Sequence, residues 1–400
     1  MTKSISASQT KNQNLKKSKK PLVIGTLFSG IGAIEHALKR LGIEHEIAFA
    51  GDIDPFCKKT YFANHDIDDS RWHDDVTKFS AKKHLNKIDL LVGGSPCQSF
   101  SMVGKRGGLE DTRGTLFYDF ARVVNECKPK VFIFENVRGL LNHDNGKTWI
   151  VIQKTLQGLG YTINSKTLNS RDYGIPQNRE RIFVVGFKKK QDSFVFPPPI
   201  PLRHTMQDFL QDFTESKYYL RTKGVKFVTS SKNRLKRYTQ ISGEIALCQK
   251  ANQQFNWHGD FIFEGLEKGI DNDEFVFEVK DIEEKYFLSQ KVKKYVLAGG
   301  TKTFKTSTKT DLEVARPLLQ SMHKMHRAGV DNYVTYKRGK IRKLTPRECL
   351  RLMGFRDSFA IPVSDTQMYR QAGNSIVVDV LIALIKQIDF AEIAKNERKL

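Results

Sequence analysis

Strand-like and helix-like segments alternate between residues 22 and 187, and this alternation limits the fold of the chain more than any other feature. Short apolar runs typical of buried strands are separated by stretches with helical periodicity. Alternation of this kind predicts an α/β domain with a mainly parallel sheet and helices on both faces. The expected strands are Leu22–Leu27, Glu46–Ala50, Ile88–Val92, Val131–Phe134 and Ile182–Phe187, and the expected helices are Ile31–Leu41, Thr115–Asn125 and Trp149–Leu159.

A proline-rich stretch, Phe196–Pro201, ends the alternation and is typical of a stiff connector. Residues 202–340 after it are less regular, so we expect a second, smaller and irregular domain. Helical periodicity returns at Thr345–Met353, where Thr345 can cap the helix and Glu348 can complete a capping box. A last apolar helix is expected at Ile376–Ile388.

The chain carries a large positive charge. Its 400 residues include 66 Lys and Arg against 44 Asp and Glu, which gives a formal net charge of +22. Such a balance favours a polyanionic partner, with nucleic acid first and an anionic membrane second. Two basic stretches, at 221–237 and 291–309, flank an acidic segment at 264–284. This distribution suits a protein that follows a nucleic-acid groove better than a uniform coat would.

The five cysteines are scattered and form no Cys-x-x-Cys pair or metal-ligand spacing with histidine. We therefore expect neither disulfides nor a metal site. No stretch reaches the roughly 18 apolar residues of a membrane span. The first 20 residues are polar and lysine-rich, without the apolar core of a signal peptide. They predict a disordered basic tail on a cytoplasmic protein that does not enter a membrane.

A loop with glycines joins the first expected strand to the first expected helix, in the run Thr26–Ala33. Gly30 and Gly32 let the backbone approach a ligand at the helix N-terminus. Asp52 follows the second expected strand, where an acid can bind ribose hydroxyls. A Rossmann dehydrogenase would share this arrangement, but the glycines lack the Gly-x-Gly-x-x-Gly spacing that holds a pyrophosphate. A nucleoside without a diphosphate fits better, with S-adenosylmethionine as the leading candidate.

Several residues capable of chemistry lie at the ends of expected strands, at the edge where open α/β sheets bind their ligands. Cys97 stands in a Pro-Cys-Gln loop just past an apolar run that ends in two glycines. A thiol at such a position can be reactive rather than structural. Glu135 ends another strand in the run Phe-Glu-Asn-Val, and the polar runs Gln177–Arg181 and Gln371–Ser375 precede a strand and the last helix.

Together and in this order, these motifs resemble the cytosine-C5 DNA methyltransferases of bacterial restriction–modification systems. The resemblance covers most of Pro21–Phe187 and of Arg342–Ile388, and several motifs in the family's order make it highly specific. It implies a Rossmann-like S-adenosylmethionine-dependent methyltransferase domain and a smaller target recognition domain. The matching stretches are Leu27–Gly32, Gly94–Ser101, Gly114–Phe117, Glu135–Leu140, Gln177–Phe183, Arg342–Phe355 and Gly373–Ser375.

The resemblance also implies a division of the chain into domains. After the tail at residues 1–20, residues 21–196 form the catalytic and cofactor-binding domain. Residues 197–341 form the target recognition domain, and 342–369 a hinge segment. Residues 370–400 form a C-terminal helix region that returns to the catalytic domain.

The resemblance assigns Cys97 as the nucleophile, Glu135 as the acid on the cytosine edge, and Arg181 as a pocket arginine near the base carbonyl, with Arg179 in support. It implies cofactor contacts by Phe28, Gly30, Gly32, Asp52, Ile53, Asp75, Pro96, Leu116 and Asn374. The family often has Glu and a large aromatic where this chain has Asp52 and Ile53, so we expect the ribose contact to survive better than the adenine contact. The expected DNA-binding residues are Gln98, Ser99, Lys105, Arg106, Lys232, Arg234, Lys236 and Arg237.

The chemistry that the resemblance implies explains these residue types. Addition of the Cys97 thiolate at C6 of cytosine makes C5 nucleophilic enough to take a methyl group. A protonated Glu135 stabilises the charge that develops at N3. The target nucleotide has to leave the duplex stack, at a cost on the order of a few kcal/mol. The basic, glycine-containing loop at 99–112 suits a lid that closes over it.

Two alternatives stay open. One branch of the same family methylates transfer RNA, but that branch lacks a recognition region as long as the about 140 residues present here. A non-catalytic DNA-binding relative would have lost Cys97, Glu135 or Arg181, and all three are present. The expected partners are double-stranded DNA and a cognate restriction endonuclease that acts on the same site, and we expect a monomer.

Overall fold

The computed structural model describes residues 20–96, 116–189, 193–211, 214–251, 256–264, 340–391 and 393. These residues belong to two compact units. The first unit contains the described residues of 20–214, 222–261 and 343–393, and the second contains those of 215–221, 262–264 and 340–342. The predicted tail, apart from Lys20, and the predicted lid loop lie outside the described residues.

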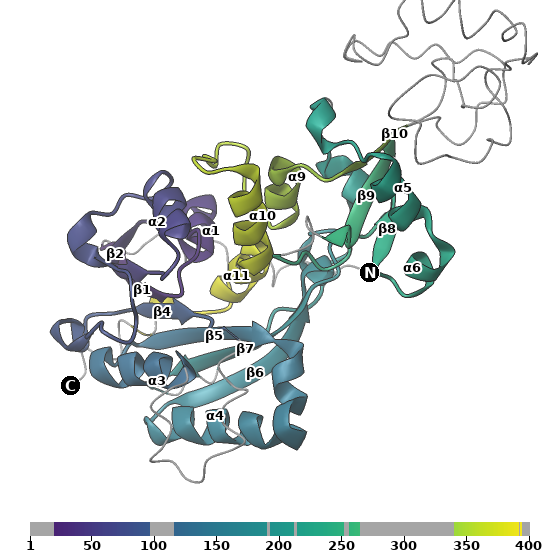
Figure 1. Cartoon of the computed structure of the whole chain (residues 1–400). Helices are drawn as coiled ribbons and strands as arrows, with labels where there is room; N and C mark the ends of the chain where they lie inside the picture. The colour runs from purple at the N-terminus through teal and green to yellow at the C-terminus, as the bar shows by residue number, and fades with distance from the viewer. Residues whose placement is uncertain are drawn as a thin grey trace, which may run out of the picture. The chain divides into compact units, whose positions relative to one another are not determined.

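A seven-stranded sheet forms the centre of the first unit (Figure 1). Its strand order is β3-β2-β1-β4-β5-β7-β6, in which β3, β2, β1, β4 and β5 are parallel and β7 is antiparallel to both its neighbours. The mainly parallel sheet confirms the predicted α/β fold. The strands are β1 Leu22–Leu27, β2 His45–Gly51, β3 Trp72–His73, β4 Leu90–Gly93, β5 Val131–Val137, β6 Thr162–Asn169 and β7 Glu180–Phe187.

Helices lie on both sides of this sheet (Figure 1). In the described ranges the α-helices are α1 Ala33–Leu41, α2 Pro55–Phe62, α3 Leu116–Cys127, α4 Lys147–Gly158, α5 Thr222–Thr229, α6 Ser231–Leu235, α9 Pro346–Leu352, α10 Asp365–Asn374 and α11 Val378–Ile385. Short 3-10 helices occur at Asp69–Arg71, Lys82–His84, Arg138–Gly146, Ser170–Tyr173, Met206–Phe209 and Ser216–Tyr218.

Apolar side chains cover both faces of the sheet. Leu91 and Phe132 pack in one cluster with Phe120 of α3. Ile133, the next residue along β5, is also buried and points to the opposite face, because side chains alternate along a strand. Burial on both faces is the usual condition of a parallel sheet. Ligands are then expected at the carboxyl ends of the strands.

The last helix packs against the first one. α1 and α11 lie side by side, and Arg40 of α1 forms a double hydrogen-bonded ion pair with Asp379 of α11. The Nη1–Oδ2 and Nη2–Oδ1 distances are 2.7 and 2.8 Å. Bidentate pairs of this kind fix orientation as well as distance. The C-terminal segment is therefore held on the helix that follows the glycine loop.

The elements that the sequence analysis did not expect are short or polar. α2 has only eight residues and begins at Pro55, with the Asp54 carboxylate accepting a hydrogen bond from the Phe56 N–H at 2.9 Å. β6 lies at the edge of the sheet, where alternate side chains face solvent, and its polar sequence suits that position. α10 begins within the stretch predicted as a hinge. α1 starts at Ala33 and not at Ile31, because Gly32 is left-handed with a φ of 81°.

A small sheet follows in the second half of the chain. β8, Thr239–Ile241, pairs in parallel with the start of β9, Gly259–Glu264, and β10, Lys340–Lys343, is the third strand of that sheet. Residues 222–261 fall within the stretch predicted as the target recognition domain, yet they belong to the first compact unit. The boundaries 197–341 of that domain stay a prediction.

One helical run, Asp365–Ile385, is long and apolar enough to cross a membrane by length and composition alone. This run contains α10 and α11. Within its most apolar window, 67% is buried inside the protein, and Leu381 and Leu384 have no exposed surface. Packing in the protein core accounts for its composition.

Candidate active site

The loop between β1 and α1 has the backbone that the glycine pattern predicted. Phe28, Gly30 and Gly32 all have left-handed φ angles, of 53°, 56° and 81°. A Cβ on Gly30 would meet no atom within 4 Å, whereas a Cβ on Gly32 would overlap the His65 ring, with Nε2 at 2.1 Å. Gly32 is therefore required by packing, and Gly30 leaves open space beside the N-terminus of α1.

Asp52 lies directly against this loop. Its Oδ2 accepts a hydrogen bond from the Gly30 N–H at 2.9 Å, and its Oδ1 accepts one from the Asp54 N–H at 3.0 Å. Burial raises the pKa of Asp52, and the two backbone hydrogen bonds oppose that shift. The next residue, Ile53, is 80% exposed. An acid thus lies beside the space at Gly30 and is followed by an exposed apolar residue, and the residues present fit a nucleoside cofactor.

Two further cofactor candidates follow strands of the same parallel set. Asp75 comes after β3, and Pro96 comes after β4. The Asp75 Oδ1 accepts hydrogen bonds from the Thr77 hydroxyl at 2.7 Å and the Thr77 N–H at 3.0 Å, and these bonds lower its pKa. A cavity of about 580 Å³ beside β2 and β3 is lined by Asp75 but by none of the other predicted cofactor residues. Asp75 is therefore the one predicted cofactor residue that lines this cavity.

The remaining cofactor candidates lie at helix ends. Leu116 is the first residue of α3 and is half-buried. Asn374 is the last residue of α10 and is exposed. Its neighbour Gly373 belongs to the arginine network described below. Asn374 is thus brought near the predicted catalytic residues, while its predicted cofactor contact stays a prediction.

A buried carboxyl lies beneath the glycine loop. Glu35 of α1 is 1% exposed and accepts a hydrogen bond from the Tyr61 hydroxyl at 2.5 Å, while its Oε2 has no hydrogen-bond partner. Burial raises the pKa of Glu35 from 4.5 to about 7, against the opposing effect of Tyr61. A carboxyl in this position is more stable with its proton than without it.

Replacing Glu35 by glutamine is expected to stabilise the protein at pH 8 but not at pH 4.5. The folded carboxyl keeps its proton up to about pH 7, whereas the unfolded one releases it near 4.5. Wild-type stability is therefore lost as the pH rises between these values, by about 3 kcal/mol. Urea unfolding at both pH values measures the difference. Glu44→Gln is the control at an exposed glutamate, and equal effects of Glu35→Gln at both pH values would contradict the prediction.

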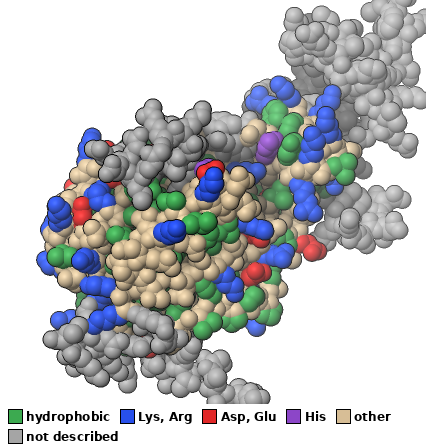
Figure 2. Space-filling model, turned by 90° about the horizontal axis from the view of Figure 1, so that it is seen from below, with side chains coloured by type: hydrophobic (Ala, Val, Ile, Leu, Met, Phe, Trp, Pro, Cys, Tyr) green, Lys and Arg blue, Asp and Glu red, His purple; other side chains and the backbone are tan. Residues whose placement is uncertain are grey.

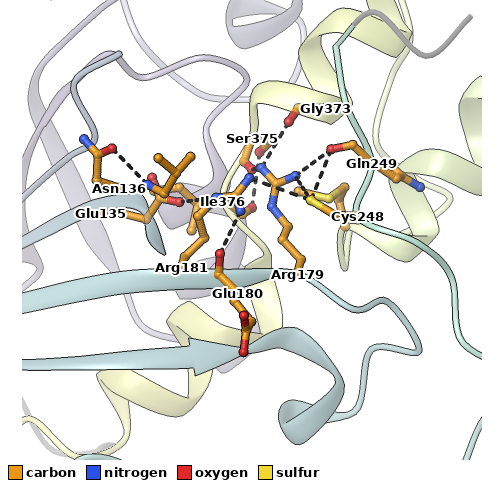
Figure 3. A network of polar contacts seen from close by, with 12 residues as sticks. Glu135, Asn136, Arg179, Glu180, Arg181, Cys248, Gln249, Gly373, Ser375 and Ile376 are labelled. Carbon is orange, nitrogen blue, oxygen red and sulfur yellow. Dashed lines mark hydrogen bonds and ion pairs between the residues drawn. The ribbon is translucent and has the colours of Figure 1, made fainter. Parts of the chain in front are cut away.

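Glu135 and Arg181 form an ion pair at the carboxyl end of β5 (Figure 3). The Arg181 Nε lies 3.1 Å from the Glu135 Oε1, and the two side chains are 17% and 13% exposed. Burial raises the pKa of Glu135, and the charges of Arg181 and Arg179 oppose that shift. The structure thus brings two of the predicted catalytic residues together, as a buried carboxyl with a raised pKa beside a guanidinium.

The end of β4 approaches this pair closely. A Cβ on Gly94 would lie 2.9 Å from both the backbone oxygen and the Oε2 of Glu135, so a larger residue would displace the carboxyl. The Asn136 side chain donates from Nδ2 to the Ser95 carbonyl at 2.9 Å. β5 therefore holds the backbone two residues before Cys97. Cys97 itself lies outside the described residues, as do Gln98, Ser99, Lys105 and Arg106.

Arg179 is 3% exposed and joins three segments (Figure 3). Its Nη1 donates to the Gln249 carbonyl at 2.9 Å, and its Nη2 donates to the Gly373 and Ser375 carbonyls at 3.0 and 2.8 Å. Sequence reasoning gave no sign of these partners. Gln249 stands in a region without a recognisable pattern, and Gly373 was part of a motif whose contacts no local spacing predicts.

Four of the basic residues predicted to bind DNA are described by the structure, and all four are exposed. Lys232 and Arg234 lie on α6, and Lys236 and Arg237 follow it. Nearby aromatic rings stack, with Tyr238 and His258 centroids 4.9 Å apart. Lysine and arginine side chains gather at the upper right of the face in Figure 2. In the described part of the chain, no group of three or more His, Cys, Asp or Glu side chains could hold a metal ion.

A family model of C-5 cytosine-specific DNA methylases matches residues 23–389. The chain belongs to this family. The match spans the glycine loop, the Glu135–Arg181 pair and the C-terminal motif with Gly373. It confirms the family that the order of motifs indicated.

Two relatives match along most of their length. The orphan methyltransferase M.SPRI of Bacillus phage SPR is 31% identical, over 94% of this chain and 99% of its own. The type II methyltransferase M.HpaII of Haemophilus parainfluenzae is 35% identical, over 90% of this chain and 87% of its own. Among solved structures, the S. pombe Dnmt2 methyltransferase matches 92% of this chain and 98% of its own, with a TM-score of 0.59 and 19% identity. That likeness shows a shared fold.

Proposed function

We propose that this protein methylates C5 of a cytosine at a specific site in duplex DNA, with a Cys97–C6 covalent intermediate. The observation that carries the proposal is the Glu135–Arg181 ion pair against Gly94, at the end of the strand that leads to Cys97. Both neighbouring strands end at the same edge of the sheet, so the acid lies at the edge where the backbone leading to Cys97 leaves β4.

Each member of the site has a distinct task in this proposal. The Cys97 thiolate adds to C6, which makes C5 nucleophilic. The protonated Glu135 donates to N3 and stabilises the charge that develops there, and Cys97 leaves when the C5 proton is removed. Arg181 holds the Glu135 carboxyl by its Nε, and its Nη1 donates to the Glu180 carbonyl at 2.8 Å. In this proposal its remaining N–H groups donate to the base carbonyl oxygen.

S-adenosylmethionine supplies the methyl group when it is bound. In our proposal Asp52 binds the ribose hydroxyls, Ile53 packs on the adenine, and the open space at Gly30 receives the ligand beside the N-terminus of α1. Phe28, Gly32, Asp75, Pro96, Leu116 and Asn374 are the further proposed contacts. Glycines and a helix N-terminus allow a close approach of the backbone to such a ligand.

A methylation assay with two acceptors tests this function. The purified protein and labelled S-adenosylmethionine are incubated with unmethylated duplex DNA and, separately, with transfer RNA. We expect 5-methylcytosine in the DNA only, and sequencing of the methylated DNA gives the recognition sequence. Transfer of label to RNA, or a methylated base other than 5-methylcytosine, would overturn the proposal.

The proposal also includes a partner endonuclease. The names of the relatives differ on this point, because M.HpaII is called a type II methyltransferase and M.SPRI an orphan methyltransferase. We propose that methylation protects cytoplasmic DNA from an endonuclease that cuts the same site. The methylated DNA is then expected to resist a restriction enzyme of that specificity.

Neutralising the basic cluster of α6 is expected to weaken binding to every duplex. The variant replaces the four exposed cations Lys232, Arg234, Lys236 and Arg237 by glutamine. Because cations on phosphates release counterions, the slope of log affinity against log salt should fall by up to about one for each phosphate contact that the variant removes. Titrations of cognate and unrelated duplexes at several salt concentrations measure this. A weaker affinity confined to the cognate site would instead make these residues base readers.

A further inference from the structure

The 246–251 segment, which precedes β9 in the chain, is held along the loop that leads into β7. The Asn178 N–H donates to the Ala246 carbonyl at 2.7 Å, and the Ala246 N–H donates to the Pro176 carbonyl at 2.7 Å. The Gln249 N–H donates to the Gln177 Oε1 at 3.0 Å. Backbone and side-chain hydrogen bonds therefore fix the path of this segment beside the predicted catalytic arginines.

Gln177 is a fully buried residue that holds this segment to a third part of the chain. Its Oε1 accepts from Gln249, and its Nε2 donates to the Leu352 carbonyl at the end of α9, at 2.8 Å. Its exposed fraction is 0%. A buried amide with both ends satisfied specifies a single arrangement of the segments that it joins, because a shift would leave a polar group unpaired.

Gly373 sets how closely the segment approaches the end of α10. A Cβ on Gly373 would lie 2.5 Å from the Ala251 nitrogen and 2.6 Å from the Lys250 carbonyl carbon. Both are backbone atoms, so an alanine at this position would have to push the segment away. A close approach of two backbone segments can require glycine even where the φ angle is one that other residues adopt.

Arg179 has no Nη hydrogen left for a substrate. Its Nη1 contacts the Gln249 carbonyl and the Cys248 Sγ, and its Nη2 donates to two carbonyls. Its Nε is buried and has no hydrogen-bond partner among the described residues. We therefore assign this buried guanidinium to positioning and not to contact with the base. Its partners are the 246–251 segment on one side and the C-terminal end of α10, with Ser375 after it, on the other.

Cys248 is the residue of the 246–251 segment that contacts Arg181 of the Glu135–Arg181 pair. Its Sγ lies 3.8 Å from the Arg179 Nη1 and 4.0 Å from the Arg181 Nη2 (Figure 3). The Arg181 Nε in turn holds Glu135. If the 246–251 segment were displaced, Cys248 would move with it. The environment of the Arg181 guanidinium, which faces Glu135, would then change.

We propose that the 246–251 segment is a positioning element for catalysis, and that Gln177, Arg179 and Gly373 hold it so that Cys248 keeps the Arg181 guanidinium on Glu135. This inference rests on the proposed function, since it deepens the description of the same site. It assigns Arg179 to positioning and leaves contact with the base to Arg181.

Gly373→Ala tests the proposal, with Gly139→Ala as the matched control, because a Cβ on Gly139 would meet no atom within 4 Å. The assay uses duplex DNA with the site that methylation sequencing identifies. We expect kcat of Gly373→Ala to fall about tenfold to a hundredfold, with the KM for DNA and cofactor changed by less than about threefold. Gly139→Ala should keep the wild-type kcat.

The pH profile distinguishes positioning from a general loss of structure. The charged groups that face Glu135 are Arg181 and Arg179, and Cys248 lies beside both. If Gly373→Ala moves Arg181 away, the pKa of Glu135 rises and the basic limb of the kcat profile moves to higher pH. A folded variant with wild-type kcat, or with a lower kcat and an unmoved limb, would overturn the proposal.

Gly373→Ala is judged unfolded if it shows no cooperative unfolding transition. In that case two further variants test the proposal. Arg179→Lys keeps the charge but loses the forked donor geometry, and Cys248→Ala removes only the sulfur. Both must then lower kcat and move the basic limb upward, the second by a smaller amount, and wild-type behaviour in both refutes the inference. Failure of the wild type to methylate DNA would instead refute the proposed function.

Discussion

Replacing Cys97 by alanine is expected to reduce methyl transfer below detection while sequence-specific DNA binding persists. Without a thiolate no adduct forms at C6, and C5 of cytosine is then too weak a nucleophile to accept the methyl group. Methyl incorporation and titration of the cognate duplex measure the two effects separately. A duplex with 5-fluorocytosine at the target should form a covalent adduct with the wild type and none with Cys97→Ala.

The other cysteines give this experiment its controls. Cys57, Cys127 and Cys349 are buried, and burial raises the pKa of the Cys57 thiol and brings that of Cys127 to about 12. Within the described ranges, Cys248 is the one cysteine with partial exposure. It lies beside Arg179 and Arg181. Cys248→Ala should still form the adduct, and an adduct that maps to Cys248 would contradict the assignment.

The sequence predicted the parts of the site that follow from the topology of a parallel sheet. Carboxyl ends of adjacent parallel strands meet at one edge, so strand-terminal residues can be placed together from the sequence alone. The contact between Gly30 and Asp52 and the placement of Glu135 at the end of β5 agree with that rule. Arg181, the partner of Glu135 in the ion pair, lies on the antiparallel strand β7. The start of β7 lies opposite the end of β5.

The contacts that no local pattern encodes were not predicted. Arg179 reaches Cys248 and Gly373, which are 69 and 194 residues away in the chain. Hydrogen bonds to backbone carbonyls leave no trace in the identity of the accepting residue, because every residue has a carbonyl. Gln177 was visible in a motif, but its partners at Gln249 and Leu352 depend on how three distant segments pack. Sequence spacing alone has no access to that packing.

Replacing Glu135 by glutamine is expected to lower kcat by about a hundredfold to ten-thousandfold, the range that a general acid contributes. Glutamine has nearly the same shape and can still donate a hydrogen bond to N3, but it has no acidic proton to share with the base. DNA affinity should change far less than kcat. Single-turnover methylation at saturating DNA isolates the chemical step from binding and product release.

The matched control for this variant is Glu180→Gln at the start of β7. Glu180 accepts a hydrogen bond from the Arg138 Nη1 at 2.7 Å, is exposed, and does not contact Glu135 or Arg181 through its carboxylate. It should keep kcat within about threefold of wild type, as exposed ion pairs contribute little. A comparable decrease in both variants would mean that kcat responds to any carboxylate removed near the arginines and not to an acid.

The pH profile separates an acid from a residue that only orients Arg181. Burial raises the pKa of Glu135, so the carboxyl holds its proton at low pH and loses it as the pH rises through that pKa. Wild-type kcat should therefore fall on the basic side, and this limb should be absent in Glu135→Gln because an amide does not titrate. If the variant is slow but retains the wild-type basic limb, the titrating acid is another group. If its kcat stays within about tenfold of wild type, Glu135 does not supply the proton.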